Sequence, residues 1–149
     1  MTILQQIMNA VQTRFQTIIV KNNYSSDIGN NVTIQKTTNY SQGEPDGIDL
    51  VFEEDDPKFF SESLFDHVIK VKACIYFQDG NDTFINITEA NNDVLIAIGK
   101  DTKWTVNGTP LAYFTLPGLT VTKLKQDGAL ICGSEVNFTI KYKTLPWTS

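Results

Sequence analysis

The sequence predicts one α+β domain with a mainly antiparallel sheet and two amphipathic helices packed on one face. Three observations support this prediction. Two segments have the apolar spacing of helices, several others alternate as strands do, and the order helix, strands, helix, strands lacks the alternation of βαβ repeats. The chain has 149 residues, 41% of them hydrophobic, which is enough to bury one core. We therefore expect a single domain spanning residues 1–149.

The first helix is predicted at the start of the chain. Its apolar residues recur at steps of three and four residues: Ile3, Ile7, Val11, Phe15 and Ile18. Thr2 can cap its start, while the other face is rich in glutamine and carries one charge, Arg14. We expect this helix to pack across a sheet, and its uncharged outer face also suits contact with a neighbour.

A turn and two strands are predicted next. Residues 21–31 are dense in Asn, Ser, Asp and Gly, which predicts a turn in which Gly29 is able to take a positive φ. Residues 32–35 and 48–52 alternate as strands, with a polar loop between them. The acidic residues 53–56 lead into a proline and are expected to form a solvated loop that ends the second strand.

The clearest strand is predicted at residues 67–77. Its apolar residues fall on one face: Ile69, Val71, Ala73, Ile75 and Phe77. His67, at the start of this strand, is expected at the surface. After a turn at residues 79–82, Asp82 can cap a second helix and Gly99 can stop it. Helical spacing on that helix is kept by Phe84, Ile87, Asn91, Val94, Leu95 and Ile98.

The rest of the chain is predicted to be rich in β-structure. The Asn107-Gly108 pair is the strongest hairpin signal in the sequence. The predicted strands cover residues 104–106, 111–116, 119–126, 129–132 and 135–143.

Composition and charge argue against several classes of binding partner. The net charge of −5 argues against non-specific binding to nucleic acid and against binding to anionic membranes, because both need basic patches. We expect no specific nucleic-acid binding either. Other proteins are the expected partners. The first residues lack the pattern of a signal peptide, so we expect a cytoplasmic protein in which Cys74 and Cys132 are reduced, buried thiols.

The sequence offers little chemistry. His67 is the only histidine, and no glycine-rich phosphate loop or metal-ligand spacing is present. Residues 79–82 lack the alternating ligands of a calcium loop and are predicted to be a turn. We therefore expect no enzyme activity, no cofactor and no metal, with a hydrolase that uses the acidic residues as a remote alternative.

Two segments have apolar residues suited to an interface. Residues 57–65 place three phenylalanines and a leucine in a connection between strands, and the chain ends on Leu-Pro-Trp-Thr-Ser. The alternatives are that the connection folds onto its own core and that Trp147 fills a groove of its own subunit. The candidate interface residues are Phe59, Phe60, Leu64, Phe65, Leu145 and Trp147.

Several sequence features occur together in one known family. The opening helix closes with RFQTI at residues 14–18, the turn at 24–32 is YSSDIGNNV, and IDLV follows at 48–51. A long strand, a second helix, Trp104 and a β-rich end complete the pattern. This layout resembles the tail-terminator and minor-tail proteins of bacteriophages and prophages over nearly the whole chain.

The resemblance implies a structural subunit of the virion tail, assembled in the bacterial cytoplasm. Six copies would form a ring that caps the tail tube, ends its growth and offers a surface to the head-completion or connector protein. A ring joins two different surfaces, which residues 59–65 and 145–147 could supply. The acidic residues could line the channel and repel passing DNA. These residues are Glu53, Glu54, Asp55 and Asp56.

Two other functions remain open at this point. The chain could be another tail or neck component, such as a head–tail connector or a tail-tube subunit. Alternatively, it could be a small carbohydrate-binding or ligand-binding domain, with Trp104, Tyr113 and Phe114 as an aromatic platform for a sugar.

Overall fold

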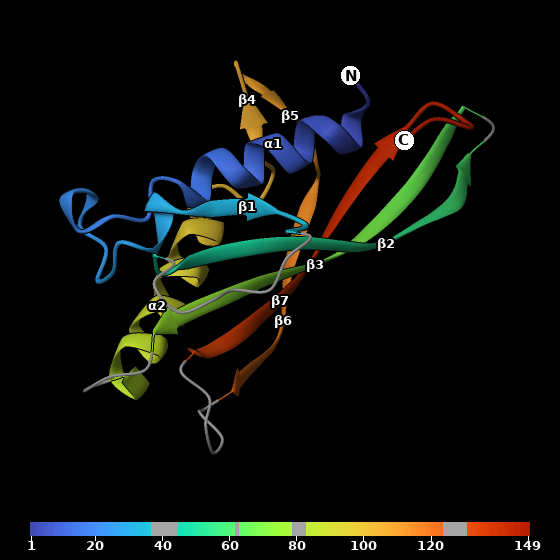
Figure 1. The fold of residues 1–149 in the computed structure, drawn as a ribbon. Helices are drawn as coiled ribbons and strands as arrows, with labels where there is room; N and C mark the ends of the chain where they lie inside the picture. Colours follow the sequence, from blue (N-terminus) through green and yellow to red (C-terminus); the bar gives the residue numbers. More distant parts are fainter. Residues whose placement is uncertain (37–44, 62, 79–82, 124–130) are drawn as a thin grey trace.

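The computed structural model describes residues 1–36, 45–61, 63–78, 83–123 and 131–149 (Figure 1). Within these residues a five-stranded sheet has the order β1-β2-β3-β7-β6, and two α-helices cover one of its faces. The helices are α1 (Ile3–Phe15) and α2 (Thr83–Gly99), with short 3₁₀ turns η1 (Val20–Asn22) and η2 (Ile28–Asn30). The strands are β1 (Val32–Ile34), β2 (Gly47–Ser61), β3 (Leu64–Gln78), β4 (Thr105–Val106), β5 (Thr109–Pro110), β6 (Phe114–Lys123) and β7 (Ile131–Thr144).

The predicted α+β fold is confirmed. Strands β2, β3, β7 and β6 pair antiparallel, whereas β1 pairs parallel to β2 through Val32 and Ile48. Helix α2 contacts β3 and β7 and also touches α1, so both helices pack on the same layer. No helix in the described ranges is long and apolar enough to cross a membrane.

Helix α1 begins at the predicted cap. The Thr2 hydroxyl accepts from the Gln5 N–H at 3.1 Å, and the Gln5 side chain accepts from the Thr2 N–H at 2.9 Å. This reciprocal pair satisfies two backbone donors that a helix start leaves free. Ile7, Val11 and Phe15 are buried, as their spacing predicts.

Gly29 does not use the positive φ that glycine allows. Instead, the turn lies directly against the end of α1. A Cβ on Gly29 would lie 2.6 Å from the carbonyl oxygens of Phe15 and Ile18. The Gly29 N–H donates to the Ile18 carbonyl at 2.8 Å, so glycine is required here by close approach of two backbones.

The buried face of α2 differs from the prediction. Ile87, Val94 and Ile98 are buried, but Phe84 and Leu95 are exposed. Small residues take the sheet-facing positions in their place, since Ala90 and Ala97 are fully buried and let the helix lie close to the strands. The predicted cap Asp82 and the turn at 79–82 lie outside the described residues.

The last strands are longer and fewer than predicted. In place of the two predicted segments 111–116 and 119–126, the described residues form the single strand β6, which begins at Phe114 and shifts its register between Pro117 and Thr120. Segments 129–132 and 135–143 join likewise into β7, with residues 124–130 outside the described part. The Asn107-Gly108 hairpin is confirmed, and both residues have positive φ.

The prediction of an acidic loop is wrong. Residues 53–56 belong to the 15-residue strand β2, which continues through Pro57 to Ser61 with register shifts between Phe52 and Asp55 and between Phe59 and Ser61. Strand β3 then returns from Leu64. The β2–β3 hairpin and the end of β7 extend past the helices as an arm, toward the upper right of Figure 1. Long-range strand pairing decides this, because β3 supplies partners for Asp55 and Asp56 that the local sequence does not reveal.

Candidate functional site

The two predicted interface segments form one aromatic surface on the arm. Phe59 pairs with Phe65 across the hairpin, and their ring centroids lie 6.3 Å apart. Phe65 in turn packs edge-on against Trp147, with centroids 5.1 Å apart. The exposed fractions are 72% for Phe59, 68% for Leu145 and 90% for Trp147, while Phe65 and Leu64 are partly buried. We call Phe59, Phe65, Leu145 and Trp147 the arm patch.

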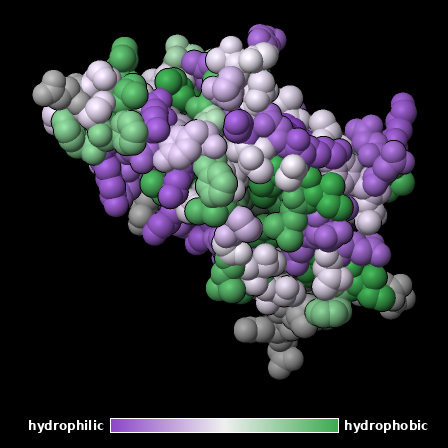
Figure 2. Space-filling view, turned by 180° about the vertical axis from the view of Figure 1, so that it is seen from behind, coloured by the Kyte–Doolittle hydropathy of each residue, from purple (hydrophilic) through white to green (hydrophobic). Residues whose placement is uncertain are grey.

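This arrangement corrects one sequence-based expectation. Residues 59–65 and 145–147 were expected to meet between neighbouring subunits, but they already meet within one chain. The reason is the pairing of β3 with β7, which places Phe65 opposite Thr144 and so brings the C-terminal segment to the hairpin. Figure 2 shows hydrophobic residues around the end of the arm, at the upper left of that view.

A second contact set lies close to the arm patch. Phe60 is 55% exposed, and the Lys143 Nζ lies 3.9 Å from its ring centroid and 4.6 Å from that of Tyr113. The Tyr113 hydroxyl donates to the Asp66 carboxylate at 2.8 Å. Burial and this hydrogen bond raise the pKa of Tyr113, so it remains a donor at neutral pH. The Lys143 ammonium is attracted to the face of the Phe60 ring that it covers, and Phe60 remains more than half exposed.

A polar cluster lies beneath the arm patch, on the helix side of the sheet. His67 is only 2% exposed, which corrects the prediction that it lies at the surface. Its Nδ1 lies 2.8 Å from Asp55 Oδ1, its Nε2 lies 2.7 Å from Thr144 Oγ1, and its ring stacks on Tyr142 with centroids 4.5 Å apart. The Tyr142 hydroxyl donates to Asp55 Oδ2 at 3.0 Å.

The cluster has a carboxylate, an imidazole and a hydroxyl in series, as in a nucleophilic triad. Thr144 is nevertheless buried, and its hydroxyl donates to the Thr148 carbonyl at 3.1 Å, so it presents no free nucleophile to a substrate. Burial and the neighbouring Asp55 carboxylate raise the pKa of Tyr142. The arrangement is suited to holding strands β2, β3 and β7 and the chain end together.

Open space adjoins this cluster. A cleft of about 310 Å³ lies between the arm patch and His67. It is lined by Asp55, Pro57, Phe65, His67, Trp147, Thr148 and Ser149.

The acidic residues of β2 are divided between different environments. Asp55 belongs to the polar cluster. Glu53 instead forms an ion pair with Lys72 at 2.8 Å, and Asp56 lies 3.7 Å from Lys58 Nζ. The side chain of Glu54 lies outside the described residues. These carboxylates therefore do not act as one acidic surface.

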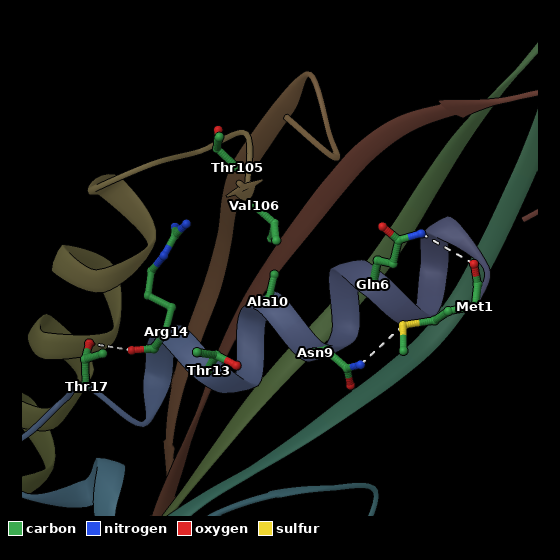
Figure 3. Close-up of a pocket in the computed structure, with 9 residues that line it drawn as sticks. All are labelled: Met1, Gln6, Asn9, Ala10, Thr13, Arg14, Thr17, Thr105 and Val106. Carbon is green, nitrogen blue, oxygen red and sulfur yellow. Dashed lines mark hydrogen bonds between the residues drawn. The ribbon is translucent and has the colours of Figure 1, made fainter. Parts of the chain in front are cut away.

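The outer face of α1 forms a groove with the β4–β5 hairpin. Figure 3 shows its lining side chains, which come from α1 and the residues just before and after it on one side and from β4 on the other. The groove has a volume of about 510 Å³. Arg14 is its charged residue, and the guanidinium is occupied by Asp101 at 3.4 Å and by the Trp104 ring at 4.1 Å. The lining is otherwise uncharged: Met1, Gln6, Asn9, Ala10, Thr13, Thr17, Thr105 and Val106.

The aromatic platform predicted for a sugar-binding domain is not formed. Trp104 is fully buried, and its indole N–H donates to Thr115 Oγ1 at 2.9 Å. Phe15 and Phe138 pack around Trp104 in the core. Tyr113 and Phe114, in contrast, remain partly exposed at the surface. The sequence could not reveal this, because Trp104 follows a turn rather than an alternating strand.

Sequence reasoning missed the polar cluster, although a signal for it was present. The alternation that buries Ile69 and Val71 extends back to His67, and the alternation along β7 extends forward from Tyr142 to Thr144. Cys74, expected to be buried, is partly exposed on the other face, and the Cys132 side chain lies outside the described residues. No protein-family model and no curated protein matches the chain.

Proposed function

We propose that the chain is a structural subunit that assembles with copies of itself into a ring, as a bacteriophage tail terminator. The arm patch carries this proposal. A monomer rarely exposes aromatic residues together at the end of a projecting hairpin, and aromatic residues are enriched at protein interfaces. Phe59, Phe60 and Trp147 are all more than half exposed on this arm. The resemblance in layout specifies the tail tube and the head-completion protein as further partners.

A closed ring needs a second surface that differs from the first. Because the two apolar segments merge into the arm patch, the second surface must lie elsewhere. The α1 groove meets the requirement, since its lining is uncharged apart from the occupied Arg14 and it has room for a large side chain. We therefore assign the contact between subunits to the arm patch of one copy and the α1 groove of the next.

The first test is the native mass across a concentration series, with electron-microscope images of the same sample. Rings of six 16.7-kDa chains support the proposal. Long filaments would indicate a tail-tube subunit instead. A monomer at every concentration, both alone and when mixed with tail tubes, would overturn it.

A complementation experiment tests the two surfaces. Trp147→Ser removes the arm anchor, and Ala10→Glu places a charge in the groove. Each variant alone is expected to be monomeric. Their mixture retains one intact groove and one intact arm, so it should form dimers and no rings. Leu119→Ser is the matched control, because Leu119 is 73% exposed on β6 outside both surfaces and its loss should leave the ring intact.

The channel role of the acidic residues stays a prediction, restricted to the carboxylates that are exposed. Replacing Glu53 and Asp56 by lysine should slow DNA passage and lower infectivity if they line the channel. Unchanged infectivity of particles with normal tail length would remove this role.

A further inference from the structure

A series of hydrogen bonds leads from β2 to the C-terminal segment. Asp55 accepts from Tyr142 at 3.0 Å and contacts His67 Nδ1 at 2.8 Å. On the other side of the ring, His67 Nε2 lies 2.7 Å from Thr144 Oγ1, and Thr144 Oγ1 lies 3.1 Å from the carbonyl oxygen of Thr148. His67 thus stands between a carboxylate and a hydroxyl that contacts the chain end, which the Ile3 N–H also holds by donating to the Ser149 carbonyl at 2.9 Å.

The positions of the protons follow from the chemistry of the partners. A carboxylate only accepts, so the His67 Nδ1 contact with Asp55 requires a proton on Nδ1. A carbonyl also only accepts, so the single hydroxyl proton of Thr144 is directed at Thr148. The contact between Nε2 and Oγ1 then requires a second proton, on Nε2. All of these contacts are satisfied together when His67 is an imidazolium.

Loss of one proton breaks this series. In neutral His67, Asp55 keeps the Nδ1 proton, and Nε2 becomes an acceptor. The Thr144 hydroxyl then has two competing acceptors, Nε2 at 2.7 Å and the Thr148 carbonyl at 3.1 Å. Rotation toward the nearer nitrogen releases the carbonyl.

We propose that protonation of His67 latches the C-terminal segment, residues 145–149, onto β7 through Thr144. Within the described residues, the titratable groups that contact His67 are Asp55 from β2 and Tyr142 from β7. The first turn of α1 carries no acidic residue. Asp55 acts as an acceptor in both states, so His67 is the group whose change of charge reaches the segment.

The latch also acts on the arm patch, a step that rests on the proposed function. Leu145 and Trp147 lie in the latched segment, and Trp147 contacts Phe65. Holding the segment reduces the entropy lost when these side chains enter a neighbouring groove. Ring formation should therefore be favoured by acidification across the titration of His67.

The test uses two NMR readouts on the whole chain. His67 is the only histidine, so its imidazole signals report its protonation without overlap. The Thr148 N–H, which donates to the Leu145 carbonyl at 3.3 Å, reports the segment through its exchange protection. As the pH rises through the His67 titration recorded by the imidazole signals, this protection should fall about two- to tenfold, the range for one hydrogen bond, with the same midpoint.

Thr144→Val removes the hydroxyl while keeping the shape. His67 should still titrate in this variant, but Thr148 protection should no longer follow it. Thr139→Val makes the same change on β7 outside the cluster and should behave as wild type. Constant Thr148 protection across the His67 titration in the wild-type chain would overturn the latch, as would unaltered coupling in folded Thr144→Val. Both readouts belong to the chain itself, so they decide the latch whether or not rings form.

Discussion

The ring of Phe65 packs edge-on against the ring of Trp147, with centroids 5.1 Å apart. The first residue belongs to the β2–β3 hairpin and the second to the segment after β7. Trp147 has a φ of +62°, a backbone conformation that is uncommon outside glycine. The aromatic contact and the turn closed by Thr148 together hold it there. The chain end is therefore part of the arm.

A double-mutant cycle should detect this contact. Phe65→Ala, Trp147→Ala and the double variant are compared by urea unfolding under monomeric conditions. We expect a coupling energy of about 0.5–1.5 kcal/mol, as measured for aromatic pairs. The matched cycle of Phe60 with Trp147 serves as the control. Additive effects of Phe65 and Trp147 would contradict a fixed C-terminal segment.

Gly29→Ala should destabilise the fold by about 2–4 kcal/mol. The added methyl group would lie 2.6 Å from two carbonyl oxygens, and neither belongs to a flexible side chain. Gly99→Ala is the control, since a Cβ there meets nothing within 4 Å and alanine favours a helix end. Thermal unfolding of both variants checks the prediction. Equal midpoints would show that the turn can move away from α1.

Asp55→Ala should lower the free energy of unfolding by about 3 kcal/mol. It leaves the His67 ring and the Tyr142 hydroxyl without their acceptor in a buried cluster. Asp56→Ala, the neighbouring acidic residue, should change stability by less than about 0.5 kcal/mol because it is exposed. Urea unfolding at neutral pH measures both. A similar small loss for the two variants would mean that the cluster contributes little.

Asp101 should make the stability of the fold depend on pH in the acid range. Burial opposes its ionisation, but hydrogen bonds from the Thr105 and Lys103 N–H groups outweigh this, and its pKa falls below the ordinary 3.8. A lowered pKa in the folded state stabilises the fold above pH 3.8, and this contribution is lost as the pH drops through the folded value. Asp101→Asn should therefore flatten the acid side of the stability curve. A parallel downward shift at every pH would contradict this.

The fold was largely predictable because local patterns agree with it. Alternation identified the core face of β3, and the spacing from Ile3 to Phe15 identified α1 with its cap. The patterns failed where partners far along the chain decide. Considered alone, acidic residues 53–56 are typical of a loop, yet they belong to strand β2, and β3 pairs with Asp55 and Asp56.

The candidate site was predictable only in part. The phenylalanines of residues 57–65 were identified from the sequence as interface candidates. The contact between Phe65 and Trp147 was not, because it depends on the register of β3 against β7. The residues of the polar cluster come from three strands and the chain end. No short sequence pattern predicts that segments so far apart in the chain meet. His67 was expected at the surface because it was predicted to open a strand directly after a loop, next to Asp66, whereas strand alternation places it inward.

The sheet order has a further consequence for how the protein avoids uncontrolled aggregation. In the described residues, β6 and the part of β2 beyond Leu50 have no strand on their outer side, and such open edges invite endless edge-to-edge pairing. Each edge is interrupted by a register shift and contains a proline, Pro57 or Pro117, which offers no N–H. Backbone pairing between copies is thereby disfavoured, and with it the growth of a fibre. Specific association then depends on side-chain contacts instead.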